Sequence, residues 1–214
     1  MEPNCLKWAK QLAALAQDGL TYSQNPYEIE RYQHIREIAA EMMVAGPRGG
    51  GAESGIEKRC VLELLAREEG YATPKVDVRA AAFRDGKILL VKEKVDDGWT
   101  LPGGWADPCQ SPSEAAVREA FEESGFHVLA TKLAAVYDRS KHPHLPYMPF
   151  HIYKHFFICE IIGGSPTESH ETTAVDFFAR DAIPEKLSIS RTLPEQLTRM
   201  FDHYHDPALP TDFD

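Results

Sequence analysis

Residues 101–126 read LPGGWADPCQSPSEAAVREAFEESGF, and the residues of this stretch set both ends of one helix. The run Ser-Pro-Ser-Glu at 111–114 has the order of a capping box, in which serine caps the helix and glutamate bonds back to the serine amide. Proline suits the first helical position, and Gly125 suits a left-handed C-terminal cap. We therefore predict a helix over residues 112–124.

Three glutamates of this helix, Glu119, Glu122 and Glu123, are spaced i, i+3 and i+4, so their carboxylates lie on one face. Acidic helix faces usually alternate with lysine four residues along, but the only cation here is Arg118, about 100° around the helix. Unpaired carboxylates repel one another, and Mg²⁺, which prefers carboxylate and water oxygens, would relieve that repulsion. From these residues alone, a solvated acidic face is an equally good interpretation.

The Pro-Gly-Gly turn at 102–104 favours the metal-binding interpretation. Glycine lets the backbone approach a neighbouring group closely, so the carbonyl of Gly104 is a candidate oxygen ligand beside the glutamates. Taken singly, a Gly-Gly turn is more often only a turn. The turn, the capping box and the glycine stop together indicate a cation site.

The same stretch resembles the Nudix box, G-x5-E-x7-R-E-U-x-E-E-x-G-U, in which U is a bulky aliphatic residue. Six of its seven fixed letters are present, at Gly104, Arg118, Glu119, Glu122, Glu123 and Gly125. Ala120 and Phe126 replace bulky aliphatic residues, and Gln110 replaces a glutamate. Only Gln110 touches the chemistry.

Gln110 stands where the resemblance implies a glutamate that fixes the box arginine or lies near the metal. Its amide oxygen can accept a hydrogen bond but supplies no charge. Glu114, four residues before Arg118 on the same helix, is expected to supply the missing ion pair.

The resemblance implies an α+β fold, a Nudix-type α/β/α sandwich with a mixed sheet. It implies hydrolysis of a nucleoside diphosphate linked to another moiety, to a nucleoside monophosphate and the phosphorylated moiety. The expected cofactor is Mg²⁺ (or Mn²⁺), which orients the diphosphate and activates water. The implied metal ligands are Gly104, Glu119, Glu122 and Glu123. The implied catalytic residues are Arg118, Glu119 as ligand or base, Glu122, and a later loop acid, Glu171, with Glu168 as the other candidate. A solvated loop acid without a catalytic role is an equally good interpretation of these last two residues.

Two further regions are candidates for substrate binding. Arg79 lies in an otherwise apolar strand and needs a carboxylate or phosphate partner, so a simple structural salt bridge is the alternative. The segment 137–147 mixes aromatic, basic and imidazole groups, which makes Tyr137 and Arg139 candidates for contacting the nucleotide. A flexible surface loop is the interpretation that we favour for this segment, and its histidines at 142 and 144 do not suffice for a metal site.

Apolar periodicity predicts three N-terminal helices, at 6–17 with Gly19 as its stop, from 26 to about 46, and at 56–68. The glycine-rich run 46–55 is expected to be a flexible connection. β-type segments follow, at 76–83, 87–92, 129–137, 151–162 and 174–179, before a terminal helix over 194–204. The Asp-Gly at 85–86 predicts a hairpin. We therefore expect a helical domain over residues 1–70 and a catalytic domain over 71–214.

The N-terminal part, with Lys-Trp-Ala-Lys at 7–10 and Gly-Leu-Thr-Tyr at 19–22, resembles the helical extension of a Nudix subgroup. That subgroup includes CDP-choline pyrophosphatases and proteins named as ADP-ribose pyrophosphatases. The resemblance implies a substrate of one of these types. The broad apolar helix faces suggest packing, either in a homodimer or against the substrate pocket.

Composition narrows the possible partners. The formal net charge of −10 argues against a large nucleic-acid surface, because such binding relies on Lys and Arg neutralising phosphates. The four cysteines are scattered without a zinc or disulfide spacing, so we expect reduced thiols. The chain begins without a signal-peptide pattern and has no apolar run of about 20 residues, so we expect a cytoplasmic protein without a membrane partner.

Two other functions stay open at this point. Gln110 is the one hint of a catalytically weak Nudix-fold module that binds or senses a nucleotide, whereas the three helix glutamates favour an enzyme. Processing of RNA ends is the second alternative, and the acidic balance counts against it.

Replacing Gln110 with glutamate tests the cost of the missing charge. We expect the wild type to turn over with weaker or altered metal affinity, and Gln110→Glu to need less Mg²⁺ for half-maximal turnover, because a carboxylate returns to the site. Turnover measured against Mg²⁺ concentration compares the two. A wild type that is inert towards all nucleoside diphosphate substrates would contradict this expectation.

Overall fold

The computed structural model describes residues 2–45 and 57–214. The described chain divides into two compact units. One contains the residues up to Pro74 together with Ser140–His151, and the other contains Lys75–Arg139 and Ile152–Asp214. The expected flexible connection at 46–55 and the expected third-helix start at Ile56 lie outside the described residues.

The helical unit is built from three α-helices, α1 (Asn4–Tyr22), α2 (Pro26–Ala45) and α3 (Lys58–Ala66), and the prediction of helices in this part is confirmed. Small residues such as Ala9 and Ala39 are fully buried, which lets the helices pack closely. Met43, Val61 and Leu65 complete the apolar cluster between them. These helices therefore have a core of their own.

The prediction that Gly19 ends the first helix is wrong, because α1 continues to Tyr22. A Cβ atom at Gly19 would overlap the aromatic ring of Tyr32 on α2. Because glycine has no side chain, the Tyr32 ring can lie close to α1 at this position. A helix tolerates an interior glycine when packing requires it.

The expectation of a flexible surface loop over 137–147 is wrong for much of that segment. Ser140–His151 groups with the helical unit, and the Ser140 carbonyl accepts a hydrogen bond from the Glu2 amide at 3.0 Å. His144 is buried, and Tyr147 packs against the apolar cluster of the helices. A residue pattern of mixed polarity did not reveal this packing, since it has no helix or strand period.

The second unit contains a seven-stranded mixed sheet with the order β3-β2-β1-β5-β4-β7, and β6 pairs with β2. Its strands are β1 (Lys75–Arg84), β2 (Lys87–Glu93), β3 (Trp99–Thr100), β4 (Phe126–Asp138), β5 (Ile152–Gly164), β6 (Thr172–Phe178) and β7 (Asp212–Phe213). β1 runs parallel to β5, and β4 runs parallel to β7. The two-residue strands β3 and β7 were not predicted, because so short a segment carries no alternation of side chains.

The local signals in the sequence account for the main turns. Asp85 and Gly86 both have positive φ angles, 51° and 74°, between the antiparallel strands β1 and β2, so the predicted hairpin is confirmed. β4 begins three residues earlier than expected, at Phe126, because the Gly125 cap leads directly from the helix into the strand.

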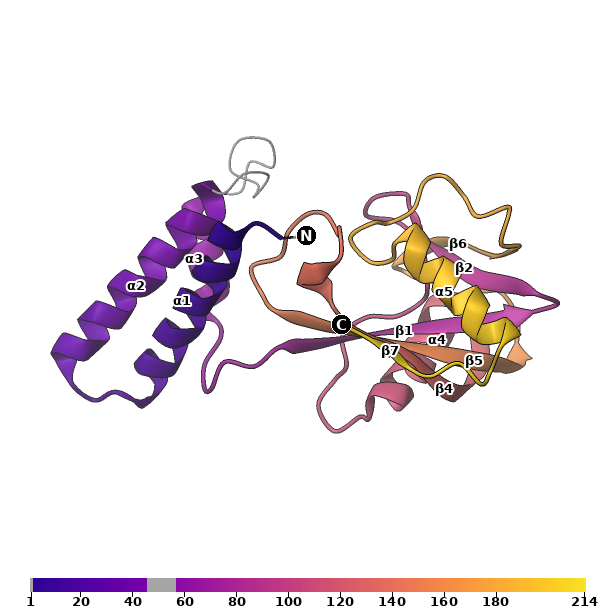
Figure 1. Cartoon of the computed structure of the whole chain (residues 1–214), viewed down its shortest axis with the longest axis horizontal. Helices are drawn as coiled ribbons and strands as arrows, with labels where there is room; N and C mark the ends of the chain where they lie inside the picture. The colour runs from indigo at the N-terminus through magenta and orange to yellow at the C-terminus, as the bar shows by residue number, and fades with distance from the viewer. Residues whose placement is uncertain (1, 46–56) are drawn as a thin grey trace. The chain divides into compact units, whose positions relative to one another are not determined.

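Helices cover both faces of the sheet, so the predicted α/β/α sandwich is confirmed (Figure 1). On one face, α4 (Pro112–Ser124) buries Ala115, Ala116 and Ala120 against alternate residues of β1. On the other face, α5 (Pro194–His205) packs Leu197, Met200 and Phe201 against Ala81, Phe83 and Phe156. A short 3-10 turn, η1 (Arg139–Lys141), follows β4.

Two other findings concern the described residues as a whole. No described helix combines the length and the apolar character needed to cross a bilayer. Cys5, Cys60, Cys109 and Cys159 are all free thiols, as the sequence predicted.

Replacing Gly125 with alanine tests the turn that ends α4. The φ angle is +76°, and a Cβ atom would overlap the Ser165 carbonyl oxygen and lie 2.7 Å from the Thr167 side chain. Gly86 is a matched control, because its φ angle is +74° but a Cβ atom there meets nothing within 4 Å. Gly86→Ala should lower the free energy of unfolding by about 1–2 kcal/mol because of the left-handed backbone alone. Gly125→Ala should lower it clearly more, because the added Cβ atom also overlaps its neighbours. Equal losses in urea unfolding would contradict this account of Gly125.

Candidate active site

Helix α4 presents the predicted glutamates, and its start is set by the predicted capping box. The Ser111 hydroxyl accepts from the Glu114 amide at 3.3 Å, and the Glu114 carboxylate accepts from the Ser111 amide at 2.8 Å. Gly125 adopts the left-handed conformation at the other end. These two caps fix where α4 begins and ends, and the alanine face that packs against β1 sets the depth of each glutamate.

The three glutamates differ in burial. Glu123 is 5% exposed, Glu119 is partly buried, and Glu122 is exposed. Burial, together with the charge of Glu122, raises the pKa of Glu119 despite the ion pair with Arg118. The shared helix face is therefore not a uniformly solvated acidic surface, and its inner end is desolvated.

Glu123 is the most perturbed carboxyl of this group. Burial raises its pKa to about 8, and the charges of Glu93 and Glu119 add to this effect. Arg79 and the amide of Gly103 oppose the shift, and that amide donates a hydrogen bond of 2.9 Å to Glu123 Oε2. A buried carboxyl among like charges is the kind of group that functional sites hold ready for a cation or a proton.

The glycine turn lies against both β1 and α4. Gly103 has a φ angle of +147°, and a Cβ atom there would overlap the Val78 carbonyl oxygen. A Cβ atom at Gly104 would lie 3.1 Å from the Glu119 carboxylate. The Gly104 carbonyl accepts a 2.8 Å hydrogen bond from the Val78 amide and retains one lone pair. Gly103 is therefore required for the turn to lie this close to β1, and a side chain at Gly104 would displace the Glu119 carboxylate.

Arg118 gathers the acidic groups at the outer end of the site. Its guanidinium lies 2.9 Å from Glu119, 2.7 Å from Glu122 and 3.2 Å from Asp107. Its Nε donates to Gln110 Oε1 at 3.1 Å. Although partial burial opposes it, the charges of these carboxylates raise the pKa of Arg118.

The expectation that Glu114 supplies the ion pair missing at Gln110 is wrong. The Glu114 carboxylate bonds to Ser111 in the capping box, and Asp107 from the preceding turn pairs with Arg118. Sequence spacing along one helix did not reveal Asp107, because the contact depends on how the turn folds back.

Arg79 belongs to a buried charge cluster on β1 and β5. Its Nε and Nη2 donate to the two carboxylate oxygens of Asp77 at 3.0 and 2.6 Å, and its Nη1 donates to the Leu101 carbonyl at 3.2 Å. Lys154, opposite Asp77 in the β1–β5 register, binds the same carboxylate. The carboxylate partner predicted for Arg79 is therefore Asp77, and a direct contact between Arg79 and substrate stays a prediction.

The charged groups of the cluster shift one another's pKa values strongly. Burial alone would raise the pKa of Asp77, but Arg79 and Lys154 hold it far below its usual range. Burial lowers the pKa of Lys154 to about 7, opposed by Asp77. One carboxylate thus compensates two cations, and the charge of Arg79 also acts on Glu119 and Glu123.

The other sequence candidates lie in different places. Tyr137 is buried against Phe156, and its hydroxyl donates to Asp212 at 3.2 Å. Arg139 is buried, and its Nη2 donates to the Ser190 carbonyl at 3.4 Å. The substrate-binding roles of Tyr137 and Arg139 stay predictions, to which these internal contacts add nothing.

The later loop acids have different surroundings. Glu168 is exposed. Glu171 is also exposed, but its carbonyl accepts from the Lys94 amide at 2.9 Å, and its charge raises the pKa of Glu93. Glu171 therefore lies near the end of β2, and the catalytic role predicted for it stays a prediction.

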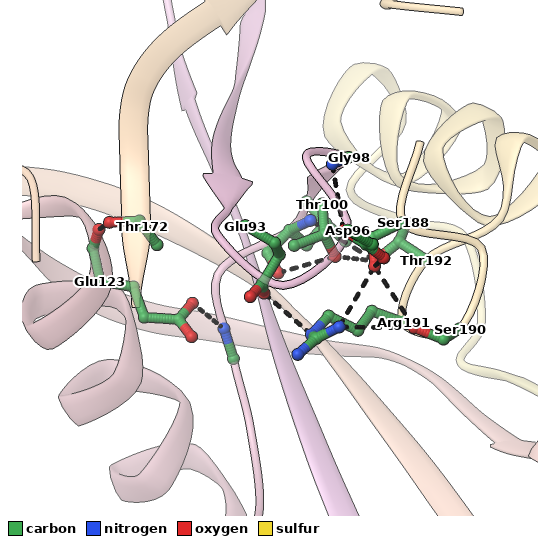
Figure 2. Close-up of polar contacts among 12 residues, drawn as sticks. Glu93, Asp96, Gly98, Thr100, Glu123, Thr172, Ser188, Ser190, Arg191 and Thr192 are labelled. Carbon is green, nitrogen blue, oxygen red and sulfur yellow. Dashed lines mark hydrogen bonds and ion pairs between the residues drawn. The ribbon is translucent and has the colours of Figure 1, made fainter. Parts of the chain in front are cut away.

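Glu93 is a residue of this region that sequence reasoning missed. It ends β2, is 2% exposed, and forms an ion pair with Arg191, whose Nε lies 2.8 Å from Glu93 Oε1 (Figure 2). Burial raises its pKa, opposed by Arg191 and Arg79. The available signal was an acidic residue directly after an apolar strand, and its partner nearly 100 residues away could not be read from spacing.

These residues fit a hard divalent cation. The donors are carboxylate and carbonyl oxygens, which suit Mg²⁺ and Mn²⁺, and the buried Glu93 Oε1 receives no aligned hydrogen bond. No three His, Cys, Asp or Glu side chains of the described residues are already arranged as a metal-ligand group. If Glu119 and Glu122 held the metal, they would have to give up their ion pairs with Arg118.

Known families match both parts of the sequence. Residues 73–197, more than half of the chain, match the NUDIX domain. The chain belongs to the Nudix family. Residues 3–46 match a second family, described as a UDP-X-like N-terminal oligomerisation domain. The resemblance of the box and of the helical extension is confirmed, and so is the Nudix fold.

Individual relatives agree with this assignment. The Bacillus subtilis protein named "Putative ADP-ribose pyrophosphatase YjhB" is 41% identical, and the match covers 97% of each chain. A crystal structure of a UDP-X diphosphatase is 30% identical, with a TM-score of 0.61 over 99% of this chain and 98% of that one. An ADP-ribose pyrophosphatase from Streptococcus suis is 35% identical, with a TM-score of 0.58 over 66% of this chain and 100% of that one. The chain is a Nudix hydrolase acting on pyrophosphate bonds, a family that generally uses divalent metals such as Mg²⁺.

Replacing Asp77 with asparagine tests the buried charge cluster. Arg79 and Lys154 would lose their shared carboxylate, so we expect a loss of about 3–5 kcal/mol in the free energy of unfolding. The folded pKa of Asp77 lies below its unfolded value, so its contribution is fully present above about pH 4 and falls as the pH drops towards the folded pKa. Urea unfolding from pH 7 to pH 3 should therefore show a narrowing gap between wild type and Asp77→Asn.

Asp181→Asn, at an exposed aspartate, is the control for this experiment. It should unfold like the wild type at every pH. A gap between Asp77→Asn and wild type that stays constant or widens in acid would contradict the account of the cluster.

Proposed function

We propose that this Nudix hydrolase is a metal-dependent pyrophosphohydrolase of a nucleoside diphosphate linked to another moiety. Its products are a nucleoside monophosphate and the phosphorylated moiety. The observation that carries the proposal is the buried Glu123, which lies among the charges of Glu93 and Glu119 and has a raised pKa. A group of partly desolvated carboxylates next to a glycine turn is suited to bind a cation together with substrate phosphates.

Mg²⁺ or Mn²⁺ bound at this site would neutralise charge on the diphosphate and lower the pKa of a coordinated water. Glu122 and Glu123 are proposed as ligands, with Glu119 as ligand or base and the Gly104 carbonyl as a further oxygen. In support, Glu119 lies next to Gly104, and Glu123 is held by the Gly103 amide. All of these donors lie in the unit that contains the sheet.

Arg118 and Glu171 are proposed as the other catalytic residues. Arg118 forms ion pairs with Glu119 and Glu122, so it orients their carboxylates. If the metal bound these carboxylates, the Arg118 guanidinium would be able to pair with a substrate phosphate instead. Glu171 is proposed as a base outside the helix. Its position beside the end of β2 and its exposure to solvent support that role, because a base must reach water.

The proposed substrate is of the ADP-ribose or CDP-choline type. The names of the relatives, an ADP-ribose pyrophosphatase and a UDP-X diphosphatase, support a nucleoside diphosphate derivative.

We assign catalysis to residues 71–214 and propose that the helical domain, residues 1–70, joins two chains in a homodimer. The family description of residues 3–46 supports this, as do the exposed apolar side chains of Trp8, Leu15 and Tyr22, seven residues apart on α1. Sedimentation equilibrium would measure the assembly directly, and a monomer at all concentrations would rule out the dimer.

A panel of nucleotides tests the proposed function. With Mg²⁺ or Mn²⁺, the wild type should release nucleoside monophosphate from ADP-ribose or CDP-choline, measured against NADH, UDP-sugars and diadenosine polyphosphates. Glu123→Gln should lower turnover by at least about 100-fold, the upper end for residues that support metal ligands. Glu160→Gln, at an exposed glutamate of β5, should match the wild type.

Loss of turnover on removing divalent metal with EDTA, restored by Mg²⁺, is the second expected result. Binding of the nucleotides without release of monophosphate would instead identify a nucleotide-binding module. Full turnover in EDTA would contradict the metal dependence.

A further inference from the structure

We propose that Glu93 is a further carboxylate of the cation site, placed there by the end of strand β2. Glu93 lies outside the sequence stretch that carries the other acidic ligands. The inference rests on the proposed metal dependence and deepens it, because it adds a ligand from the sheet to those from helix α4.

Strand pairing brings Glu93 to the inner end of the site. β2 pairs with β6, and Glu93 is the register partner of Thr172 after a bulge between Lys92 and Glu93. The Thr172 hydroxyl in turn donates to the Glu123 carbonyl at 2.9 Å (Figure 2). A chain of direct contacts therefore links the end of β2 to the last turn of α4. A bulge at a strand end re-aims a side chain, as is common beside active sites.

The electrostatics of Glu123 agree with this placement of Glu93. The charge of Glu93 contributes to the raised pKa of Glu123, and Arg79 acts on both carboxyls. Two buried carboxyls of like charge within such reach are unfavourable unless a cation or a proton is shared between them. Arg79 cannot fill that role alone, because both of its strongest hydrogen bonds go to Asp77.

The contact with Arg191 leaves Glu93 incompletely satisfied. Arg191 Nε lies 2.8 Å from Glu93 Oε1, yet this buried oxygen receives no hydrogen bond of acceptable geometry. The Arg191 Nη1 donates instead to Ser188 and Ser190, at 3.3 and 3.4 Å. A purely structural ion pair at this depth would be expected to align its hydrogen bonds, since a buried carboxylate is costly otherwise.

The loop that carries Arg191 is itself firmly tied to the turn after Glu93. The Ser188 hydroxyl donates to Asp96 at 2.7 Å, and the Ser188 amide donates to the Trp99 carbonyl at 2.9 Å. The hydroxyls of Thr100 and Thr192 lie 2.8 Å apart (Figure 2). Removing one charge at Glu93 therefore leaves several other bonds that hold the loop, and a Glu93 variant is expected to keep this local structure.

Binding of Mn²⁺ alone, followed by the electron paramagnetic resonance signal of free Mn²⁺, tests the proposal without any substrate. Glu93→Gln should weaken the tightest Mn²⁺ binding by at least about tenfold, the lower end for groups that support metal ligands. Glu160→Gln, which removes an exposed glutamate of β5, should bind Mn²⁺ like the wild type. Thermal unfolding measured in parallel shows whether each variant is folded.

The double variant Glu93→Gln/Arg191→Gln guards against misfolding, because it leaves no uncompensated arginine next to the neutral side chain. It should show the same loss of Mn²⁺ binding. A folded Glu93→Gln or double variant that binds Mn²⁺ like the wild type would overturn the proposal and leave Glu93 as a structural partner of Arg191. The proposed function would remain in place after that result. A wild type that binds no Mn²⁺ would contradict both the proposed function and the role of Glu93.

Discussion

The close approach of the Gly103–Gly104 turn to β1 and to helix α4 is the constraint on which the site depends. A side chain at Gly103 would overlap the Val78 carbonyl, and one at Gly104 would press on the Glu119 carboxylate. Because position 103 is glycine, its amide can reach Glu123, and the next residue can pair its carbonyl with the Val78 amide. The turn thus joins the sheet to the helix that carries the acidic groups.

The three glutamates of α4 beside this turn differ in burial. Glu123 is next to the turn and desolvated, Glu119 is intermediate, and Glu122 faces solvent beside Arg118. A cation held by such a set would have protein oxygens on its inner side and an open side for water and substrate, the usual arrangement for Mg²⁺. The charge of Arg79, which belongs to the buried cluster with Asp77 and Lys154, offsets part of the carboxylate repulsion.

Sequence predicted those features whose cause is local. The capping box at Ser111 and the cap at Gly125 determine α4 from adjacent residues, and Asp85-Gly86 determines a hairpin. The residues of the Nudix box could be named for the same reason, because one helix and one turn carry them. Local pattern therefore predicted the helix that carries the glutamates and the order of the main elements.

Features that depend on distant contacts could not be predicted in this way. Gly19 has the appearance of a helix stop, but its cause is the Tyr32 ring of the next helix. Asp107, not Glu114, pairs with Arg118 because of how a turn folds back. Glu93 forms its ion pair with Arg191 because a loop 98 residues further along the chain packs beside it. The spacing of residues in the sequence does not predict that contact.

Anomalous X-ray diffraction from crystals of the protein soaked in Mn²⁺ would show where the metal binds without assuming any reaction. The account predicts an anomalous peak within coordination distance, about 2.0–2.3 Å, of carboxylate oxygens of Glu119, Glu122 or Glu123. A peak only at unrelated surface carboxylates, with Arg118 still paired to Glu119 and Glu122, would contradict it.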